Sequence, residues 1–105
     1  MEKFKVELLP AAWDDLQEIF EFIFIDSPKS AENTFEKIMQ SLHRLEHFPL
    51  SGALVSDKVL RNHEFRMVVS SPYISFYRLV DNVIYVYHIV HGARDYKNLM
   101  KAFIT

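Results

Sequence analysis

The sequence contains no cysteine, which excludes disulfides and thiolate-bound metal ions. Glycine is scarce as well, with two in 105 residues, so we expect few sharp turns. Apolar stretches are interrupted well before the roughly 20 residues that a membrane-spanning helix needs. Residues 1–7 are charged and alternating, and they do not resemble a signal peptide. These absences favour a cytoplasmic protein that does not associate with a membrane.

The residues that are present favour one packed domain. Half of them are hydrophobic and 14% are aromatic, which argues against disorder. A chain of this length has room for one core, so we expect residues 1–105 to form a single domain. Residues 1–52 hold five Lys/Arg against ten Asp/Glu, whereas residues 53–105 hold seven against four. This asymmetry favours two faces with different partners.

The first half of the chain predicts a strand and a helical hairpin. Apolar and polar residues alternate over residues 4–8, the period of a half-buried strand, and Pro10 closes it. Apolar residues at helical spacing predict a helix over residues 11–25. Ser27-Pro28 then caps and starts a second helix, which we expect to end near Phe48. Two helices with so short a connection should form an antiparallel hairpin.

The second half predicts a sheet. We expect a loop over residues 50–61, and a short helix over residues 96–104. Between them, aromatic and β-branched residues predict three strands, over residues 65–69, 73–80 and 83–90. The last strand is almost wholly apolar, as expected when both of its faces are covered. The order β-α-α-β-β-β(-α) therefore predicts an α+β fold, in which an antiparallel sheet packs against the helical hairpin.

Three local patterns accompany this order. Residues 5–12 lead from the first strand into the first helix. In the middle strands an aromatic residue stands beside an arginine, in Phe65-Arg66-Met67 and Phe76-Tyr77-Arg78. Near the end, a strand closes with His91-Gly92, and Ala93-Arg94 follows. Together with the length and the element order, these patterns resemble the RelE/ParE superfamily of toxins from type II toxin–antitoxin systems, along essentially the whole chain.

This resemblance implies a cognate antitoxin as partner and one of two targets. One branch of the superfamily consists of ribosome-dependent mRNA interferases, which cleave messenger RNA without a metal ion. The other branch inhibits DNA gyrase and has lost the nuclease residues. In either case the resemblance implies no cofactor and no bound metal.

Five residues are candidates for catalysis. Metal-free RNA cleavage needs a base, an acid and cations that stabilise the charged phosphorane, and arginine suits the last task. Arg66, Arg78 and Arg94 lie on or just after predicted strands, where they could converge on one sheet face or instead bind the antitoxin. The alternative is that they are ordinary charges on a solvated face. His91 can act as an acid or base near neutral pH, and Tyr96 is a possible substitute for the family's catalytic tyrosine.

Other positions depart from the nuclease pattern. Ile74 stands where nuclease members carry an arginine, and Met100 is the closest match to their tyrosine. The loop around Lys58 and Arg61 does not reproduce a catalytic lysine pair. The sequence therefore favours ParE-like inhibition of gyrase over mRNA cleavage. A non-toxic interaction module with the same fold is a further alternative.

The first helix has its own indication of a partner. It carries more aromatic residues than one buried face needs, and a surplus apolar surface usually binds another molecule. These aromatic residues are Trp13, Phe20, Phe22 and Phe24. We predict that the C-terminal segment of the antitoxin lies across the helical hairpin and reaches the basic sheet face, where Arg66, Arg78 and Arg94 would contact it.

Other polar clusters are interpreted as surface features. His43 and His47 have helical metal-ligand spacing, but no third ligand is evident. The carboxylates of Asp14, Asp15 and Glu18 are expected on one acidic helix face without a basic companion. We therefore predict no metal site.

Overall fold

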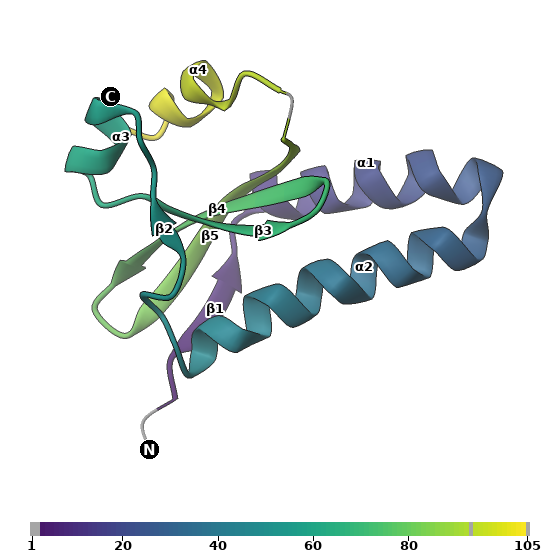
Figure 1. Ribbon diagram of the computed structural model, residues 1–105, viewed down its shortest axis with the longest axis horizontal. Coiled ribbons are helices and arrows are strands. Elements are labelled where there is room, and N and C mark those ends of the chain that lie inside the picture. Colours follow the sequence, from purple (N-terminus) through teal and green to yellow (C-terminus); the bar gives the residue numbers. More distant parts are fainter. Residues whose placement is uncertain (1–2, 93, 105) are drawn as a thin grey trace.

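The computed structural model describes residues 3–92 and 94–104, and it shows a twisted five-stranded sheet beside a long helical hairpin (Figure 1). The strands are β1 (Lys5–Leu8), β2 (Ala53–Leu54), β3 (Arg66–Ser70), β4 (Tyr73–Val80) and β5 (Val83–His91). The helices are α1 (Pro10–Asp26), α2 (Pro28–His43), the 3-10 turn η1 (Arg44–Glu46), α3 (Lys58–Asn62) and α4 (Tyr96–Lys101). The α+β class is therefore confirmed.

The sheet has the strand order β1-β5-β4-β3-β2. Strands β2 to β5 are antiparallel to their neighbours, but β1 runs parallel to β5, with Lys5 opposite Val83 and Leu8 opposite Val86. The expectation of an antiparallel sheet is thus wrong for β1. The strand direction could not be predicted, because the alternation of apolar residues shows which face of a strand is buried. It does not show the direction of the neighbouring strand.

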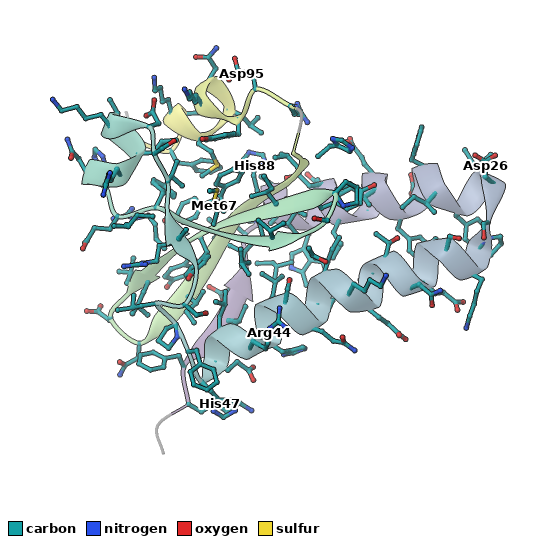
Figure 2. All side chains as sticks on the ribbon, in the orientation of Figure 1. Asp26, Arg44, His47, Met67, His88 and Asp95 are labelled. Carbon is teal, nitrogen blue, oxygen red and sulfur yellow. The ribbon has the colours of Figure 1, made fainter. Side chains whose placement is uncertain are left out.

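The hairpin follows the predicted helices closely and extends well beyond the sheet. Ser27 ends α1, and its side chain accepts a hydrogen bond from the Ser30 amide at the start of α2. Figure 2 shows the turn at Asp26 at the far end of the hairpin, whereas His88 lies over the sheet. Much of the hairpin's surface is therefore not covered by the sheet.

The expected loop over residues 50–61 is wrong in part, because it contains β2 and α3. The Asp57 side chain caps α3 by accepting a hydrogen bond from the Leu60 amide at 3.2 Å. Leu60 and Val55 are fully buried. A five-residue helix and a two-residue strand are too short to produce a periodic sequence pattern, so tertiary packing determines them.

Apolar side chains fill a core on each side of the sheet. The hairpin core contains buried residues of α1, α2, η1, β4 and β5, namely Ala12, Leu16, Ile38, Leu42, Leu45, Tyr77, Ile84, Val86 and Ile89. The second core lies under α3 and α4 and contains Val55, Leu60, Phe65, Phe76, Val90 and Met100. Neighbours on β4, such as Phe76 and Tyr77, thus point to opposite faces, and β5 is covered on both, as its apolar sequence predicted.

Candidate functional site

Arg66 is held by the loop that precedes β2. Its Nη1 atom donates hydrogen bonds to the carbonyl oxygens of Gly52 at 2.7 Å and Leu50 at 3.2 Å. Arg66 lies opposite Tyr77 in the β3–β4 register, so the two side chains share the hairpin face of the sheet. The positive charge of Arg66 is therefore directed at backbone carbonyl groups.

Tyr77 binds the same loop through its hydroxyl group. Its hydroxyl group donates to the Pro49 carbonyl oxygen at 2.8 Å and accepts from the Gly52 amide at 3.0 Å. Burial raises the pKa of Tyr77, while the Gly52 hydrogen bond and the nearby Arg66 oppose that rise. A Cβ atom at Gly52 would lie 2.6 Å from the Tyr77 hydroxyl oxygen, so the loop can close only over glycine.

Arg78 lies on the other face of the sheet. Its guanidinium carbon is 5.2 Å from the centroid of the Phe65 ring, which belongs to the second core. The expectation that Arg66 and Arg78 converge on one face is therefore wrong. Since Arg66 shares a face with Tyr77, the residue that follows Tyr77 must point to the opposite side.

Tyr96, the candidate catalytic tyrosine, packs against the second core. Its ring stacks on Phe76, with 4.6 Å between the centroids and 29° between the planes. Met100 is fully buried in the same core, and Ile74 packs against it. The two positions at which the nuclease pattern was missing are thus occupied by packed apolar side chains.

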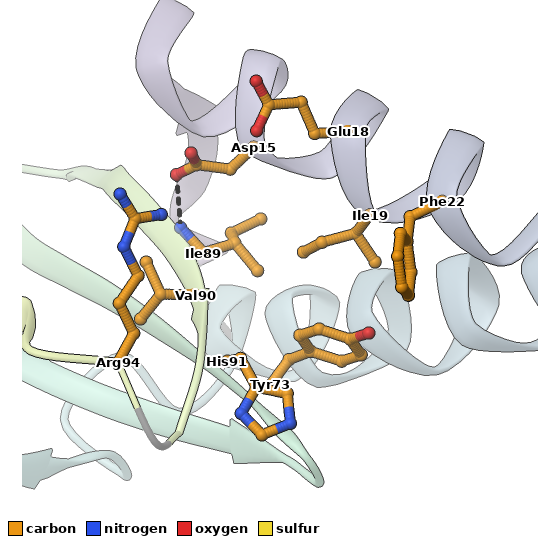
Figure 3. Close-up of a pocket in the computed structure, with 9 residues that line it drawn as sticks. All are labelled: Asp15, Glu18, Ile19, Phe22, Tyr73, Ile89, Val90, His91 and Arg94. Carbon is orange, nitrogen blue, oxygen red and sulfur yellow. Dashed lines mark hydrogen bonds between the residues drawn. The ribbon is translucent and has the colours of Figure 1, made fainter.

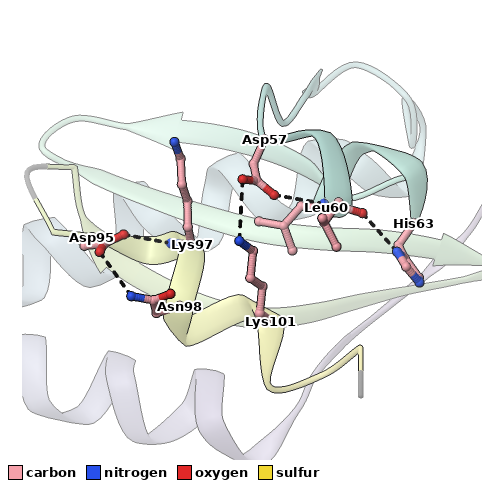
Figure 4. A network of polar contacts seen from close by, with 8 residues as sticks. Asp57, Leu60, His63, Asp95, Lys97, Asn98 and Lys101 are labelled. Atoms are coloured by element: carbon pink, nitrogen blue, oxygen red, sulfur yellow. Dashed lines mark hydrogen bonds and ion pairs between the residues drawn. The ribbon is translucent and has the colours of Figure 1, made fainter.

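The helix that carries Tyr96 is fixed by a small polar network (Figure 4). Asp95 caps α4 by accepting a hydrogen bond from the Lys97 amide at 3.2 Å. At the other end, the Nζ atom of Lys101 lies 3.9 Å from a carboxylate oxygen of Asp57, the residue that caps α3. Of these contacts, the ion pair of Lys101 and Asp57 joins α4 to α3.

His91 and Arg94 border a cavity of about 370 Å³ between α1 and the end of β5 (Figure 3). Its walls also contain two carboxylates and several apolar side chains, and the complete set is Asp15, Glu18, Ile19, Phe22, Tyr73, Ile89, Val90, His91 and Arg94. Arg94 and His91 are exposed, and the His91 ring lies edge to face with Tyr73 at 5.8 Å. Ala93, between them, is outside the described residues.

Carboxylates of α1 line the same cavity as Arg94. Asp15 and Glu18 project from α1, and Figure 3 shows the Arg94 guanidinium on the side of the cavity where Asp15 lies. The expectation that these acids have no basic companion is therefore wrong, because the fold brings together residues about 80 positions apart. Sequence reasoning identified Arg94 but missed its acidic surroundings.

A second depression, which we call the apolar groove, lies on α1 and α2. It has a volume of about 360 Å³ and is lined by Trp13, Leu16, Gln17, Phe20 and Phe35. Trp13 is 49% exposed there, and Phe20 contacts both Phe24 and Phe35 through ring edges or tilted faces. Of the four aromatic residues singled out in the first helix, Trp13 and Phe20 line this groove and Phe24 adjoins it.

Phe22 is the exception among these aromatic residues. It is 77% exposed and lines the cavity of Arg94 instead of the apolar groove. Successive helical residues are 100° apart, so Phe22 projects from the side of α1 opposite Trp13 and Phe20. Helix α1 therefore presents apolar side chains to two separate depressions.

Comparison with known proteins identifies the family. The model of the family described as "ParE toxin of type II toxin-antitoxin system, parDE" matches residues 6–96. The chain belongs to this family of ParE toxins. The expectation of a RelE/ParE superfamily toxin is thereby confirmed, while comparison with curated proteins gives no match.

Solved structures share the fold of this ParE-family toxin. A structure titled "Chromosomal ParDE TA system from P. aeruginosa" matches with a TM-score of 0.70 and 17% identity, over 85% of this chain and 96% of that chain. The RelBE2 toxin–antitoxin complex from Mycobacterium tuberculosis matches with a TM-score of 0.63 and 17% identity, over 90% and 97%. At this identity the likeness establishes the fold of the toxin.

The described residues of the toxin contain no cluster of metal ligands. Within residues 3–92 and 94–104, no group of three or more His, Asp or Glu side chains could hold a metal ion. His43 instead lies 3.5 Å from Glu46, and His47 packs edge to face with Phe48. No helix in the described ranges is long and apolar enough to cross a membrane.

Proposed function

We propose that this ParE-family toxin acts by binding and inhibiting DNA gyrase, and that it does not cleave RNA. The observation that carries the proposal is the separation of the candidate catalytic residues. Arg66 binds a loop, Arg78 points to the opposite sheet face, and Tyr96 stacks in a core. A nuclease needs its acid, base and cations around one phosphate, but Arg66 lies on the sheet face opposite Arg78 and Tyr96.

Arg94 and His91 are the residues through which we expect the toxin to contact its partners. Both are exposed, His91 at the end of β5 and Arg94 shortly after it. The same pair supports the alternative, a ribosome-dependent mRNA interferase, since a cation and an imidazole border one cavity. The facing carboxylates of Asp15 and Glu18 would repel a phosphate group there, so we rank cleavage second.

We further propose that the cognate antitoxin occupies the apolar groove. The two solved structures of similar fold are described by their titles as a toxin–antitoxin system and a toxin–antitoxin complex, which supports such a partner for this chain. The groove offers Trp13, Phe20 and Phe35 as an apolar floor for an amphipathic helix. An exposed aromatic cluster of this kind is the usual anchor of an interface.

The charge of helix α1 predicts which charged residues the antitoxin segment carries. Helix α1 carries five carboxylates and no lysine or arginine. A segment that crosses α1 should therefore have basic residues at the edges of its apolar face. Arg78 lies on the sheet face away from the hairpin, so a segment that contacts it must pass round the edge of the sheet and should carry acidic residues there.

Purified toxin tests the proposed target directly. It should inhibit supercoiling of relaxed plasmid by gyrase, and an equimolar amount of the antitoxin encoded by the neighbouring gene should restore supercoiling. Arg94→Met should weaken inhibition, whereas Lys37→Met, on α2 away from the cavity, serves as a matched loss of one positive charge. Supercoiling that is unchanged at saturating toxin would overturn the gyrase proposal.

A further inference from the structure

One carboxylate joins the first helix to the last strand. The Oδ2 atom of Asp15 accepts a hydrogen bond from the Ile89 amide at 2.9 Å and lies 2.6 Å from Nδ1 of His88. A carboxylate only accepts, so Nδ1 of His88 is the donor. The Asp15 and His88 side chains are 14% and 11% exposed. Hydrogen bonds to a charged acceptor in such enclosed surroundings are stronger than those between neutral groups.

The contact lies just beyond the point where β1 stops pairing with β5. Strand β1 covers β5 from Val83 to Val86, and the Leu9 amide donates to the Val86 carbonyl oxygen before the chain turns into α1. Beyond Val86, no strand of the described ranges covers this side of β5, which continues to His91. Asp15 therefore supplies to Ile89 the acceptor that the next residue of a longer β1 would have supplied.

The fixed stretch of β5 leads directly to the exposed residues of the cavity. His91 lies two residues after Ile89, and its carbonyl oxygen accepts a hydrogen bond from the Arg94 amide at 2.9 Å. On the β4 side, the Gly92 amide donates to the Pro72 carbonyl oxygen at 2.8 Å. The segment of His91 and Arg94 is thus tied to the β3–β4 turn on one side and to Asp15 on the other.

We propose that Asp15 is a positioning residue, which fixes the end of β5 so that His91 and Arg94 face the cavity beside α1. It does not need to touch a partner in order to matter for one. Loss of the carboxylate releases the Ile89 amide and the His88 ring together, and the segment that follows loses its attachment to α1. The expected effect of Asp15 on gyrase inhibition through Arg94 rests on the proposed function. The expected effect of Asp15 on the order of β5 does not.

Amide hydrogen exchange measures the structural part of this proposal. Asp15→Ala should speed exchange of the Ile89 amide by about tenfold or more, beyond any change in global stability. Asp15→Asn keeps an acceptor at the same place and should retain most of the protection. Asp15→Glu keeps the charge but displaces it by a methylene, and should protect Ile89 less than Asp15→Asn does. Asp14→Ala, the exposed neighbour on α1, should leave Ile89 unchanged.

These exchange rates decide the structural role. If Ile89 exchanges equally fast in Asp15→Ala and the wild type, the positioning role is refuted. If Asp15→Ala does not fold, the order of Asp15→Asn and Asp15→Glu still decides, because a reversed order would show that charge alone matters.

A double-mutant cycle then tests the functional part, with the toxin concentration for half-inhibition of supercoiling as the readout. Asp15→Ala should raise this concentration roughly tenfold, and Asp15→Ala combined with Arg94→Met should be no weaker than Arg94→Met alone. Additive effects, or an unchanged Asp15→Ala, would refute positioning of Arg94. If the wild type does not inhibit gyrase, the proposed function fails, and hydrogen exchange alone upholds or refutes the role of Asp15.

Discussion

Arg66 on β3 and Arg94 after β5 occupy contrasting surroundings. Arg66 donates to two backbone carbonyl groups of a loop whose Gly52 is also bound by buried Tyr77. Arg94 is exposed and lines a cavity together with two carboxylates. One arginine thus stabilises the fold, and the other is presented to solvent. Nearby backbone acceptors therefore decide which of these arginines is available for a partner.

The strongest way to break the Arg66 region is to fill Gly52. In Gly52→Ala, the new Cβ atom would lie 2.7 Å from the Met67 carbonyl oxygen and 2.6 Å from the Tyr77 hydroxyl oxygen. Backbone cannot yield as a flexible side chain does, so we expect a loss of about 3 kcal/mol in the free energy of unfolding. Urea denaturation measures it. Gly92→Ala, where the nearest atom is 3.4 Å away, is the matched control and should cost much less.

Removal of the Tyr77 hydroxyl should have the next largest effect. Tyr77→Phe leaves the Gly52 amide and the Pro49 carbonyl group without their partner, at a cost of about 2 kcal/mol. A loss below about 0.5 kcal/mol by urea denaturation would show that the hydroxyl group does not fasten the loop.

The same variant should change the response to alkaline pH. Because the folded-state pKa of Tyr77 is raised, its stabilising contribution is complete below the unfolded value near 10 and is lost as pH rises through the folded-state pKa. The melting temperature of the wild type should therefore fall more steeply above pH 10 than that of Tyr77→Phe. Tyr85→Phe, a half-buried tyrosine on β5, is the control, and equal slopes for all three proteins would contradict this assignment.

Matched variants of Arg66 and Arg94 test whether the two arginines differ in their contribution to stability. Arg66→Met should lose about 1.5 kcal/mol of stability, because two hydrogen bonds to the loop disappear. Arg94→Met should stay within about 0.5 kcal/mol of the wild type, as expected for an exposed side chain, but should weaken target inhibition. Urea denaturation and supercoiling assays measure the two properties. Equal destabilisation by both variants would remove the distinction between the arginines.

The smallest effect on stability is expected at the apolar groove. Trp13→Ala removes a half-exposed side chain and should change the free energy of unfolding by less than about 1 kcal/mol. Its affinity for the antitoxin, measured by calorimetry, should nevertheless fall by roughly tenfold to a hundredfold. Phe48→Ala, an exposed aromatic residue that does not line the groove, should bind normally. Normal binding by Trp13→Ala would place the antitoxin elsewhere.

Much of the fold could be predicted from local sequence. Alternation and helical spacing gave β4, the hairpin and the final helix within a few residues, because their buried faces leave periodic patterns. The parallel pairing of β1 with β5 and the short α3 could not be predicted this way. Both depend on contacts between distant segments, such as the packing of Leu60 in the second core.

The candidate site was predicted less completely, for a related reason. Sequence adjacency to a strand identified Arg66, Arg78 and Arg94 as one group, yet the alternation of side chains separates Arg66 from Arg78. Asp15 contacts Ile89 across 74 positions of sequence, and no local signal marks that distance. Residue type indicated which side chains could act as acids, bases or cations, whereas the fold determines which of them lie close together.

Whether the toxin cleaves RNA is tested most directly by a single-turnover assay of messenger RNA bound in the ribosome, with toxin in excess over the complex. If the arginines and Tyr96 serve separate purposes, the wild-type toxin should cleave no faster than Arg94→Met or a sample without toxin. Rapid cleavage by the wild type that is lost in Arg94→Met and His91→Ala would contradict the proposal, because these two residues would then form a catalytic centre without Arg66.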